Sequence, residues 1–221
     1  MKCWAAVIAL AGCDHVFQLD TVRTQTDAAA DAAADAATFS CPAPVLADDF
    51  TGTTPCAPWG SFFPANNATA SEGNHELTFH FPPGAEARCQ SPPDVALPTG
   101  GVAVRFKMLP AGQQAYMTLE SGALGAQITV QAGRLLFQPN NGSPYASLQY
   151  DALAMQYVRL TPDATTHTIT AAYSADAITW TRMAGTAPLP DASLVDLQLK
   201  AGALDTGSSS VATFEHLIAC P

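Results

Sequence analysis

Two histidines flank a glutamate in the segment "HELTFH" (His75–His80), and these residue types could bind zinc. The zinc-protease motif needs histidines four residues apart on one helical face, with the glutamate directly after the first. Here the histidines are five apart, in a segment whose apolar residues alternate as in a strand. On a strand, His75 and His80 face opposite sides, so we predict no metal site in this segment.

Cys13 follows a short apolar run that begins after Lys2, the layout of a secretion signal. The run is well below the ~20 residues that a bilayer span needs. The segment "LAGC" (Leu10–Cys13) resembles the bacterial lipobox, in which the signal is cleaved before a cysteine that is then acylated. The resemblance implies a signal peptide at 1–12 and a lipid anchor on Cys13. It also implies a place in the bacterial cell envelope, periplasmic or on the outer surface. The alternative is an ordinary secretion signal with a coincidental cysteine.

Residues 13–40 include an alanine-rich stretch in which Asp27, Asp31 and Asp35 recur every four residues. Like charges at this spacing oppose each other on a helix, and no apolar face is available for packing. We therefore predict that 13–40 is a solvated tether that follows the acylated cysteine. A helix that binds a partner is the alternative.

From Cys41 onward, apolar and polar residues alternate with a period of two. Strands of this kind, each with one wet face, are predicted at 77–81, 102–108, 127–131, 167–173 and 195–199. Segments rich in Gly, Pro and Asn separate them. The pattern predicts an all-β domain at 41–221 made of two packed antiparallel sheets.

Several segments of this domain resemble the concanavalin A-like lectin/glucanase jelly roll, and especially the laminin-G-like modules of secreted bacterial proteins. They are "VLADDF" (45–50), "WGSFF" (59–63), "YVRL" (157–160), "YSADAITWTRM" (173–183) and "ATFEHLIAC" (212–220). The resemblance implies a sandwich of two curved sheets with adjacent first and last strands. It also implies a sugar or protein ligand on one sheet or on the rim loops.

Four cysteines remain after signal removal and acylation: Cys41, Cys56, Cys89 and Cys220. An even number in an exported domain predicts disulfides, for which three pairings exist. Zinc is the rival use, but no two of the four have the close C-x₂₋₄-C spacing. The adjacent first and last strands implied by the resemblance favour Cys41–Cys220, which leaves Cys56–Cys89.

Glycosidases on such a sandwich need two carboxylates about 5–9 Å apart across one sugar bond. On one strand this requires acids two or four positions apart, as in E-x-D-x-E. None of the five glutamates has an acid two residues away within a predicted strand. Glu72 and Glu76 are four apart, but a turn separates them. We therefore predict no catalytic residues, and a hydrolase assembled from distant residues is the alternative.

The segment "SADAITW" (Ser174–Trp180) resembles the Asp-box hairpin of sialidases but is one residue short and occurs once. We predict a structural hairpin here. In it, Asp176 accepts hydrogen bonds from turn amides, while Tyr173 and Trp180 fill space.

Sugars stack on exposed aromatic rings and form hydrogen bonds with amide and charged side chains. The candidate ligand residues on wet strand positions or in loops are Tyr116, Arg134, Tyr145, Gln149 and Tyr150. The alternative is that the tyrosines complete the core. Acids in turns (Asp48, Asp49 and Asp163) could hold calcium, but no D-x-D-x-D string is present, so no metal or other cofactor is predicted.

Nine Lys and Arg stand against nineteen Asp and Glu, which gives a formal charge of −10. A nucleic acid would be repelled, so we predict no such partner. Together, these features predict a lipid-anchored surface protein with a noncatalytic β-sandwich that binds a glycan or an envelope partner. The alternatives are a polysaccharide hydrolase on the same fold and a passive structural protein of the envelope.

Overall fold

The computed structural model describes residues 43–57, 59–92, 95, 100–108, 113–140, 142–191, 195–203 and 210–220. The predicted signal peptide, Cys13, the tether and Cys41 lie outside these residues. Within the described part of the chain there is no helix able to cross a membrane.

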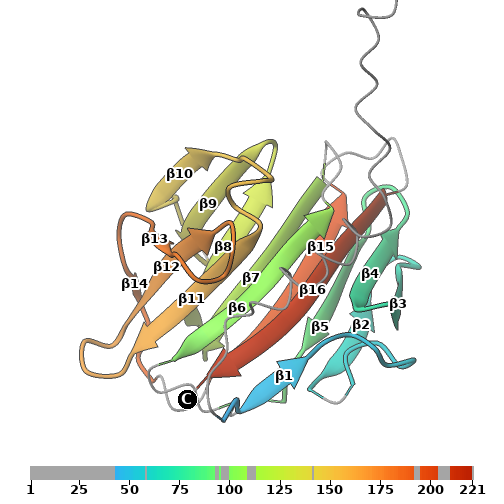
Figure 1. Ribbon diagram of the computed structural model, residues 1–221, viewed down its shortest axis with the longest axis horizontal. Coiled ribbons are helices and arrows are strands. Elements are labelled where there is room, and N and C mark those ends of the chain that lie inside the picture. The colour runs from blue at the N-terminus through green and yellow to red at the C-terminus, as the bar shows by residue number, and fades with distance from the viewer. Residues whose placement is uncertain are drawn as a thin grey trace, which may run out of the picture. The chain divides into compact units, whose positions relative to one another are not determined.

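Alternating apolar positions form two antiparallel sheets, here called sheet A and sheet B, which lie one behind the other in Figure 1. Sheet A contains β1 (Leu46–Asp48), β3 (Thr69–Gly73), β4 (Glu76–Phe81), β6 (Gly101–Met108), β11 (Tyr157–Asp163), β12 (Thr168–Ser174), β13 (Thr181–Arg182), β14 (Ala187–Pro188) and β16 (Ser210–Cys220). Sheet B contains β2 (Ser61–Pro64), β5 (Glu86–Gln90), β7 (Gln113–Ser121), β8 (Leu124–Gln131), β9 (Arg134–Pro139), β10 (Ala146–Gln149) and β15 (Asp196–Ala203). The five strands predicted from alternation correspond to β4, β6, β8, β12 and β15.

The core lies between the sheets, because one side chain in two on each inner strand points inward. In β4, Leu77, Phe79 and Phe81 are buried while the residues between them face outward. Phe214 of β16 makes edge-to-face contacts with Phe79 and Phe106, with centroid distances of 5.7 and 5.4 Å. These aromatic contacts join three neighbouring strands of sheet A and fix their inner face.

The first and last strands are neighbours, as the resemblance implied. Leu46 of β1 pairs with Ala219 of β16 in antiparallel register. The predicted disulfide between Cys56 and Cys89 is present, and it ties the loop after β1 to β5 of sheet B. Cys220 is also disulfide-bonded, while its predicted partner Cys41 lies outside the described residues. The pairing Cys41–Cys220 therefore stays a prediction.

Candidate functional site

The outer face of sheet B carries a hollow of about 520 Å³, which we call the amide hollow. It forms because the alternation that sends apolar side chains of β7, β8, β9 and β15 into the core sends the intervening polar ones outward. Amides dominate its lining, with one tyrosine, one acid and one cation: Gln114, Gln127, Gln131, Gln138, Asn140, Tyr116, Glu120 and Lys200.

The strand register brings residues far apart in sequence into one row on this face. The row crosses all seven strands of sheet B in the order Phe63, Arg88, Lys200, Tyr116, Thr129, Leu136, Ser147. At ~4.8 Å between strands, the row is roughly 29 Å long. An extended ligand lying across the strands could therefore contact several of them at once.

Tyr116 stands at the centre of the row and is held on two sides. Its hydroxyl donates a hydrogen bond of 3.0 Å to Glu86 Oε2. The Lys200 ammonium lies 5.3 Å from the centre of its ring. Burial raises the pKa of the Tyr116 hydroxyl, and the charge of Glu86 adds to the effect. Burial also lowers the pKa of Lys200, against the opposing charges of Glu120 and Glu86. Both the ring and the hydroxyl of Tyr116 are thus engaged by protein groups.

Three polar side chains form the floor of the amide hollow. Thr118 and Thr129 each lie between two lining residues of their own strand, and Gln198 lies opposite Thr118 on β15. Their exposed fractions are 0%, 1% and 3%, yet Thr118 Oγ1, Thr129 Oγ1 and Gln198 Oε1 find no hydrogen-bond partner among the described residues. Buried polar atoms are nearly always hydrogen-bonded in folded proteins. These atoms lie beneath the side chains that line the hollow, so a bound molecule meets them only where those side chains move aside.

One carboxylate of the hollow has an acidic neighbour across the strands. Glu120 of β7 lies directly opposite Asp196 of β15 in the register. On β7 itself, the outward positions two and four residues before Glu120 hold Thr118 and Tyr116. The spacing E-x-D-x-E is therefore not present on this strand. The spacing of acids along one strand does not reveal the pair Glu120 and Asp196, because the two residues lie on different strands.

Of the candidate ligand residues, three lie on the outer face of sheet B. Tyr116 lines the amide hollow, whereas Arg134 and Gln149 lie opposite each other at the β9–β10 edge. Arg134 Nε donates to Ser147 Oγ at 2.6 Å, and its Nη2 donates to the Ser147 carbonyl oxygen at 3.1 Å. Gln149 Nε2 donates to the carbonyl oxygen of Gly133.

The other two candidates lie away from the hollow. The ring of Tyr145 packs on Phe137 of the core at 5.6 Å. Tyr150 packs against the core and is half-buried, and burial raises the pKa of its hydroxyl to about 12. The structure therefore does not bring these two tyrosines together with Tyr116.

The floor residues and Lys200 were missed by sequence reasoning. Alternation in "QQAYMTLES" does place Thr118 beside Tyr116 on the wet face, so a signal existed for that residue. Alternation also places Thr129 and Gln198 on wet faces, but only the pairing of β15 with β7 and of β8 with β7 brings them and Lys200 beside Tyr116.

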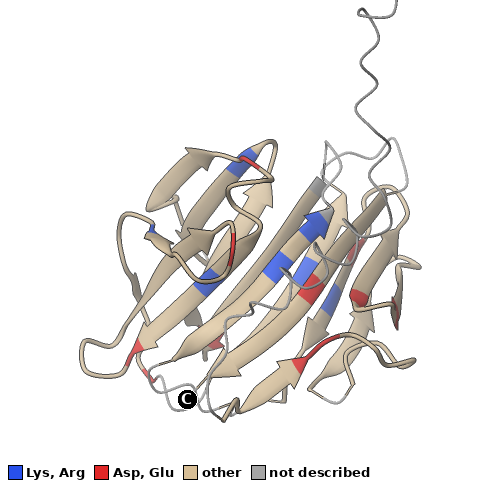
Figure 2. Ribbon diagram, in the orientation of Figure 1, with Lys and Arg blue, Asp and Glu red and all other residues tan. Residues whose placement is uncertain are grey.

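The outer face of sheet A carries paired charges instead of a hollow lined by amides. Arg105 Nη1 lies 2.8 Å from Glu215 Oε2, and Lys107 Nζ lies 2.7 Å from Glu76 Oε1. Lys107 also bonds Glu215, and these hydrogen bonds raise the pKa of its ammonium. Figure 2 shows the basic segments of β6 close to acidic ones of β16. These side chains are therefore paired with one another by charge and by hydrogen bonds.

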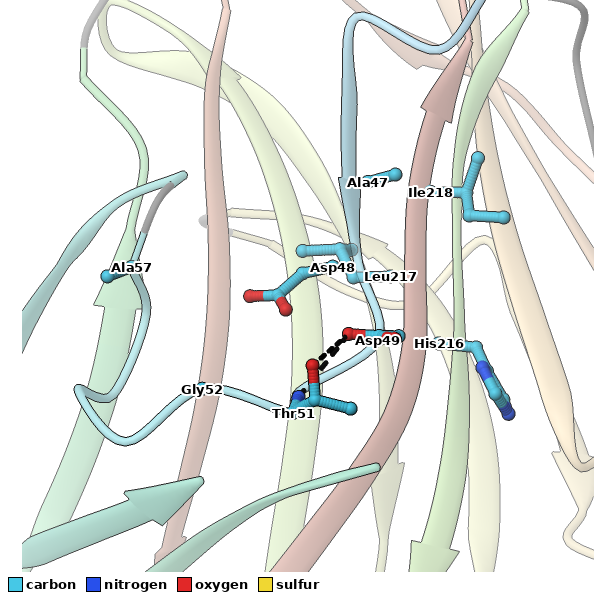
Figure 3. Close-up of a pocket in the computed structure, with 9 residues that line it drawn as sticks. All are labelled: Ala47, Asp48, Asp49, Thr51, Gly52, Ala57, His216, Leu217 and Ile218. Atoms are coloured by element: carbon cyan, nitrogen blue, oxygen red, sulfur yellow. Dashed lines mark hydrogen bonds between the residues drawn. The ribbon is translucent and has the colours of Figure 1, made fainter. Parts of the chain in front are cut away.

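A second hollow, of about 550 Å³, lies beside β1 and β16 (Figure 3). One oxygen of each of its two acids accepts hydrogen bonds from neighbouring residues, while Asp48 Oδ2 has no hydrogen-bond partner among the described residues. Asp48 Oδ1 accepts the Phe50 N–H at 2.8 Å, and Asp49 Oδ1 accepts the N–H and hydroxyl of Thr51. The third acid considered for calcium, Asp163, accepts turn amides at the β11–β12 hairpin. Among the described residues, no group of three or more His, Cys, Asp or Glu side chains could hold a metal.

Glu72 lies close to these acids and is the most perturbed carboxyl group beside the second hollow. Its Oε1 accepts the Cys56 N–H, which holds it next to the disulfide. Burial raises its pKa to about 7, and the charges of Asp48 and Asp49 act in the same direction. Burial also raises the pKa of Asp48. Glu72 therefore carries a proton in the folded protein under mildly acidic conditions.

Two facing antiparallel sheets with adjacent first and last strands define a lectin-like jelly-roll sandwich, and the comparisons with solved structures agree. LamAcat from Zobellia galactanivorans superposes with a TM-score of 0.53 at 10% identity, covering 81% of this chain and 98% of that one. A legume lectin-like domain from Entamoeba histolytica gives 0.51 at 13% identity, covering 80% and 97%. The potassium-bound Emp46p carbohydrate recognition domain gives 0.50 at 12% identity, covering 76% and 94%.

At these identities the comparisons show the fold alone. The predicted all-β, concanavalin A-like jelly-roll sandwich is confirmed. No protein-family model and no curated protein matches the sequence. The function of this chain must therefore be argued from its own residues.

Proposed function

We propose that this protein binds a glycan, without catalysis, in the amide hollow of sheet B. The observation that carries the proposal is the floor of Thr118, Thr129 and Gln198, whose buried polar atoms are left without protein partners. Hydroxyl groups of a sugar can both donate and accept, so they can bond the amides that line the hollow and, where these side chains move aside, the floor atoms beneath them. A legume lectin-like domain and a carbohydrate recognition domain share the fold, which supports the proposal.

A glycan array on the purified protein tests the proposal. Thr118→Val keeps the shape of the side chain and removes its hydroxyl, so we expect at least a tenfold loss of affinity. The matched control is Thr213→Val, because Thr213 is also buried and faces outward, but from sheet A. Equal binding by Thr118→Val and the unsubstituted protein would contradict the assignment of the site.

We further propose that Cys13 carries a lipid that anchors the protein in a bacterial cell envelope. Residues 13–40 then serve as the tether, and an envelope protein is the alternative partner of the sandwich. The support is the lipobox-like segment "LAGC" and the charged, alanine-rich stretch that follows it. Mass spectrometry of the native N-terminus should show a diacylated cysteine. An unmodified Cys13 would rule out the anchor.

A polysaccharide hydrolase is the second candidate function, and the opposition of Glu120 and Asp196 favours it. Two acids on adjacent strands could act on one glycosidic bond, and a transglycosylase shares this fold. A hydrolysis screen with the unsubstituted protein and Glu120→Gln separates the two functions. Turnover that Glu120→Gln abolishes would establish the hydrolase and refute the noncatalytic proposal.

Calcium is a further question for this site, because Emp46p was solved in potassium-bound and metal-free forms. We propose that glycan binding here needs no metal, since the hollow offers mainly amides and hydroxyls, which are neutral ligands. Binding measured with calcium and with a chelator should agree within twofold.

A further inference from the structure

The cations on the outer face of sheet B are all engaged by protein groups among the described residues. Lys200 lies over the Tyr116 ring, and Arg88 lies over the Phe63 ring at 5.1 Å from its centre. Arg134 is held by two hydrogen bonds to Ser147. Three acids share the same face, namely Glu86, Glu120 and Asp196, so its charges balance.

The polar atoms that have no hydrogen-bond partner in and beneath the hollow are uncharged amide oxygens and hydroxyls. Gln198 Oε1 and Asn140 Oδ1 can only accept hydrogen bonds, while the Thr118 and Thr129 hydroxyls can donate or accept. The amide nitrogen of Gln198 is already used, because it donates to Glu120 Oε2 at 3.1 Å. A ligand that reaches the floor must therefore supply hydrogen-bond donors to these acceptor atoms, and among the described residues of this face no cation is uncommitted.

We propose that the amide hollow selects neutral glycans with free hydroxyl groups and discriminates against uronates and sulfated glycans. This inference rests on the proposed function and names its substrate class. Sugar hydroxyls can donate the hydrogen bonds that Gln198 Oε1 and Asn140 Oδ1 do not receive from the protein. A carboxylate or sulfate supplies only acceptors, and it would lie near Glu120 and Asp196 with no uncommitted cation among the described residues of this face to offset its charge.

The engagement of Tyr116 also defines how the ligand is held. Lys200 occupies a face of the ring, and the hydroxyl is committed to Glu86. Recognition therefore depends on hydrogen bonds from amides and hydroxyls in place of stacking on an open ring. Because no ion pair with the ligand is involved, affinity should be nearly independent of salt.

Pairs of polysaccharides with the same backbone and different charge test the inference on the full-length protein. Hydroxyethyl cellulose against carboxymethyl cellulose is one pair, and dextran against dextran sulfate is another; a glycan array with neutral, uronate and sulfated members extends the comparison. We expect the neutral member of any bound pair to bind at least tenfold more tightly. We also expect less than a twofold change in its affinity between 20 and 500 mM NaCl, since screening affects only charged contacts.

Two variants connect this selectivity to the floor. Thr129→Val preserves side-chain volume and should weaken neutral-glycan binding at least tenfold, whereas Thr213→Val, on the outer face of sheet A, should change it less than twofold. Circular dichroism confirms that each variant is folded. An anionic member that binds as tightly as its neutral counterpart, with an affinity that falls as salt rises, would overturn the inference while leaving glycan binding intact. Failure of every glycan to bind would overturn the proposed function and the inference together.

Discussion

The Tyr116 hydroxyl donates a hydrogen bond to Glu86 across the whole width of β15, which separates their two strands. Tyr116 pairs with Lys200 and Glu86 pairs with Gly202, so the bond spans positions two residues apart on β15. Both groups belong to the outer face of sheet B. The bond therefore links β7 to β5 and helps to fix the wall of the amide hollow.

Removal of the Tyr116 hydroxyl should cost stability through this bond. We expect Tyr116→Phe to lower the free energy of unfolding by about 1 kcal/mol, because a typical hydrogen bond contributes ~0.5–1.5 kcal/mol net. Urea unfolding of Tyr116→Phe, Glu86→Gln and the double variant gives their coupling energy. If the two single effects simply add, the bond makes no net contribution to stability.

The Cys56–Cys89 disulfide should contribute more to the free energy of unfolding than the hydrogen bond between Tyr116 and Glu86. It joins residues 33 positions apart and holds the loop after β1 against sheet B. Replacement of both cysteines by alanine should lower the free energy of unfolding by roughly 3 kcal/mol, since the cross-link restricts the unfolded chain. Denaturant unfolding under oxidising conditions measures the loss. A change below 1 kcal/mol would show that the bridge adds little to packing that is already sufficient.

Phe214 should be the most sensitive aromatic position in the core, because it contacts rings on both neighbouring strands. Phe214→Ala leaves a cavity between Phe79 and Phe106 and should cost about 3–5 kcal/mol. The control is Phe63→Ala, since Phe63 is 44% exposed and its contact with Arg88 is worth about 1 kcal/mol or less. Equal losses in thermal unfolding would contradict the assignment of the core.

Alternation along the chain was enough to predict the architecture, and one residue shows where it fails. In "ATFEHLIAC", strict alternation places His216 on the same side as Phe214 and Ile218. A bulge between Glu215 and Ile218, with φ of 49° at His216, reverses the order. Leu217 is buried instead, and His216 and Ile218 line the second hollow. A one-residue bulge moves every later side chain of the strand to the opposite face, and the hydrophobic pattern does not reveal it.

The sequence could predict only those residues of the candidate site that the pattern of a single strand places on the wet face. Tyr116 was identified because it lies on the wet face of a strong strand pattern. Thr129, Gln198 and Lys200 become its neighbours through pairings between strands that are far apart in sequence. Such long-range register depends on the whole sheet, so residue types and spacing alone could not reveal the floor of the hollow.

The Asp176 carboxyl group should titrate at unusually low pH although it is exposed. Its Oδ1 accepts the N–H groups of Ile178 and Thr179, as the predicted structural hairpin requires. These bonds favour the charged form and lower the pKa of Asp176 below the usual 3.8, as turn amides also do for Asp163. Carbon-detected NMR titration should give both residues lower pKa values than a model aspartate. A normal value for Asp176 would mean that the turn opens in solution.

Glu72 should make the protein less stable as the pH rises from about 4.5 to 7. Burial raises its pKa from 4.5 to about 7, so the folded state holds its proton over a range in which the unfolded chain releases it. Stability from this group is complete below the unfolded pKa and is lost as the pH passes through the folded value. Asp48, whose pKa burial also raises, acts in the same direction.

Glu72→Gln isolates this effect, because glutamine keeps an oxygen that can accept the Cys56 N–H and cannot lose a proton. We expect the Tm of the unsubstituted protein to fall more steeply between pH 5 and 8 than that of Glu72→Gln, which should be relatively more stable at pH 8. Glu76→Gln is the control, since Glu76 forms a partly exposed ion pair with Lys107, and it should keep the steeper slope. Parallel slopes for all three proteins would show that Glu72 ionises normally, and the buried carboxyl group beside the disulfide would then carry its charge at neutral pH.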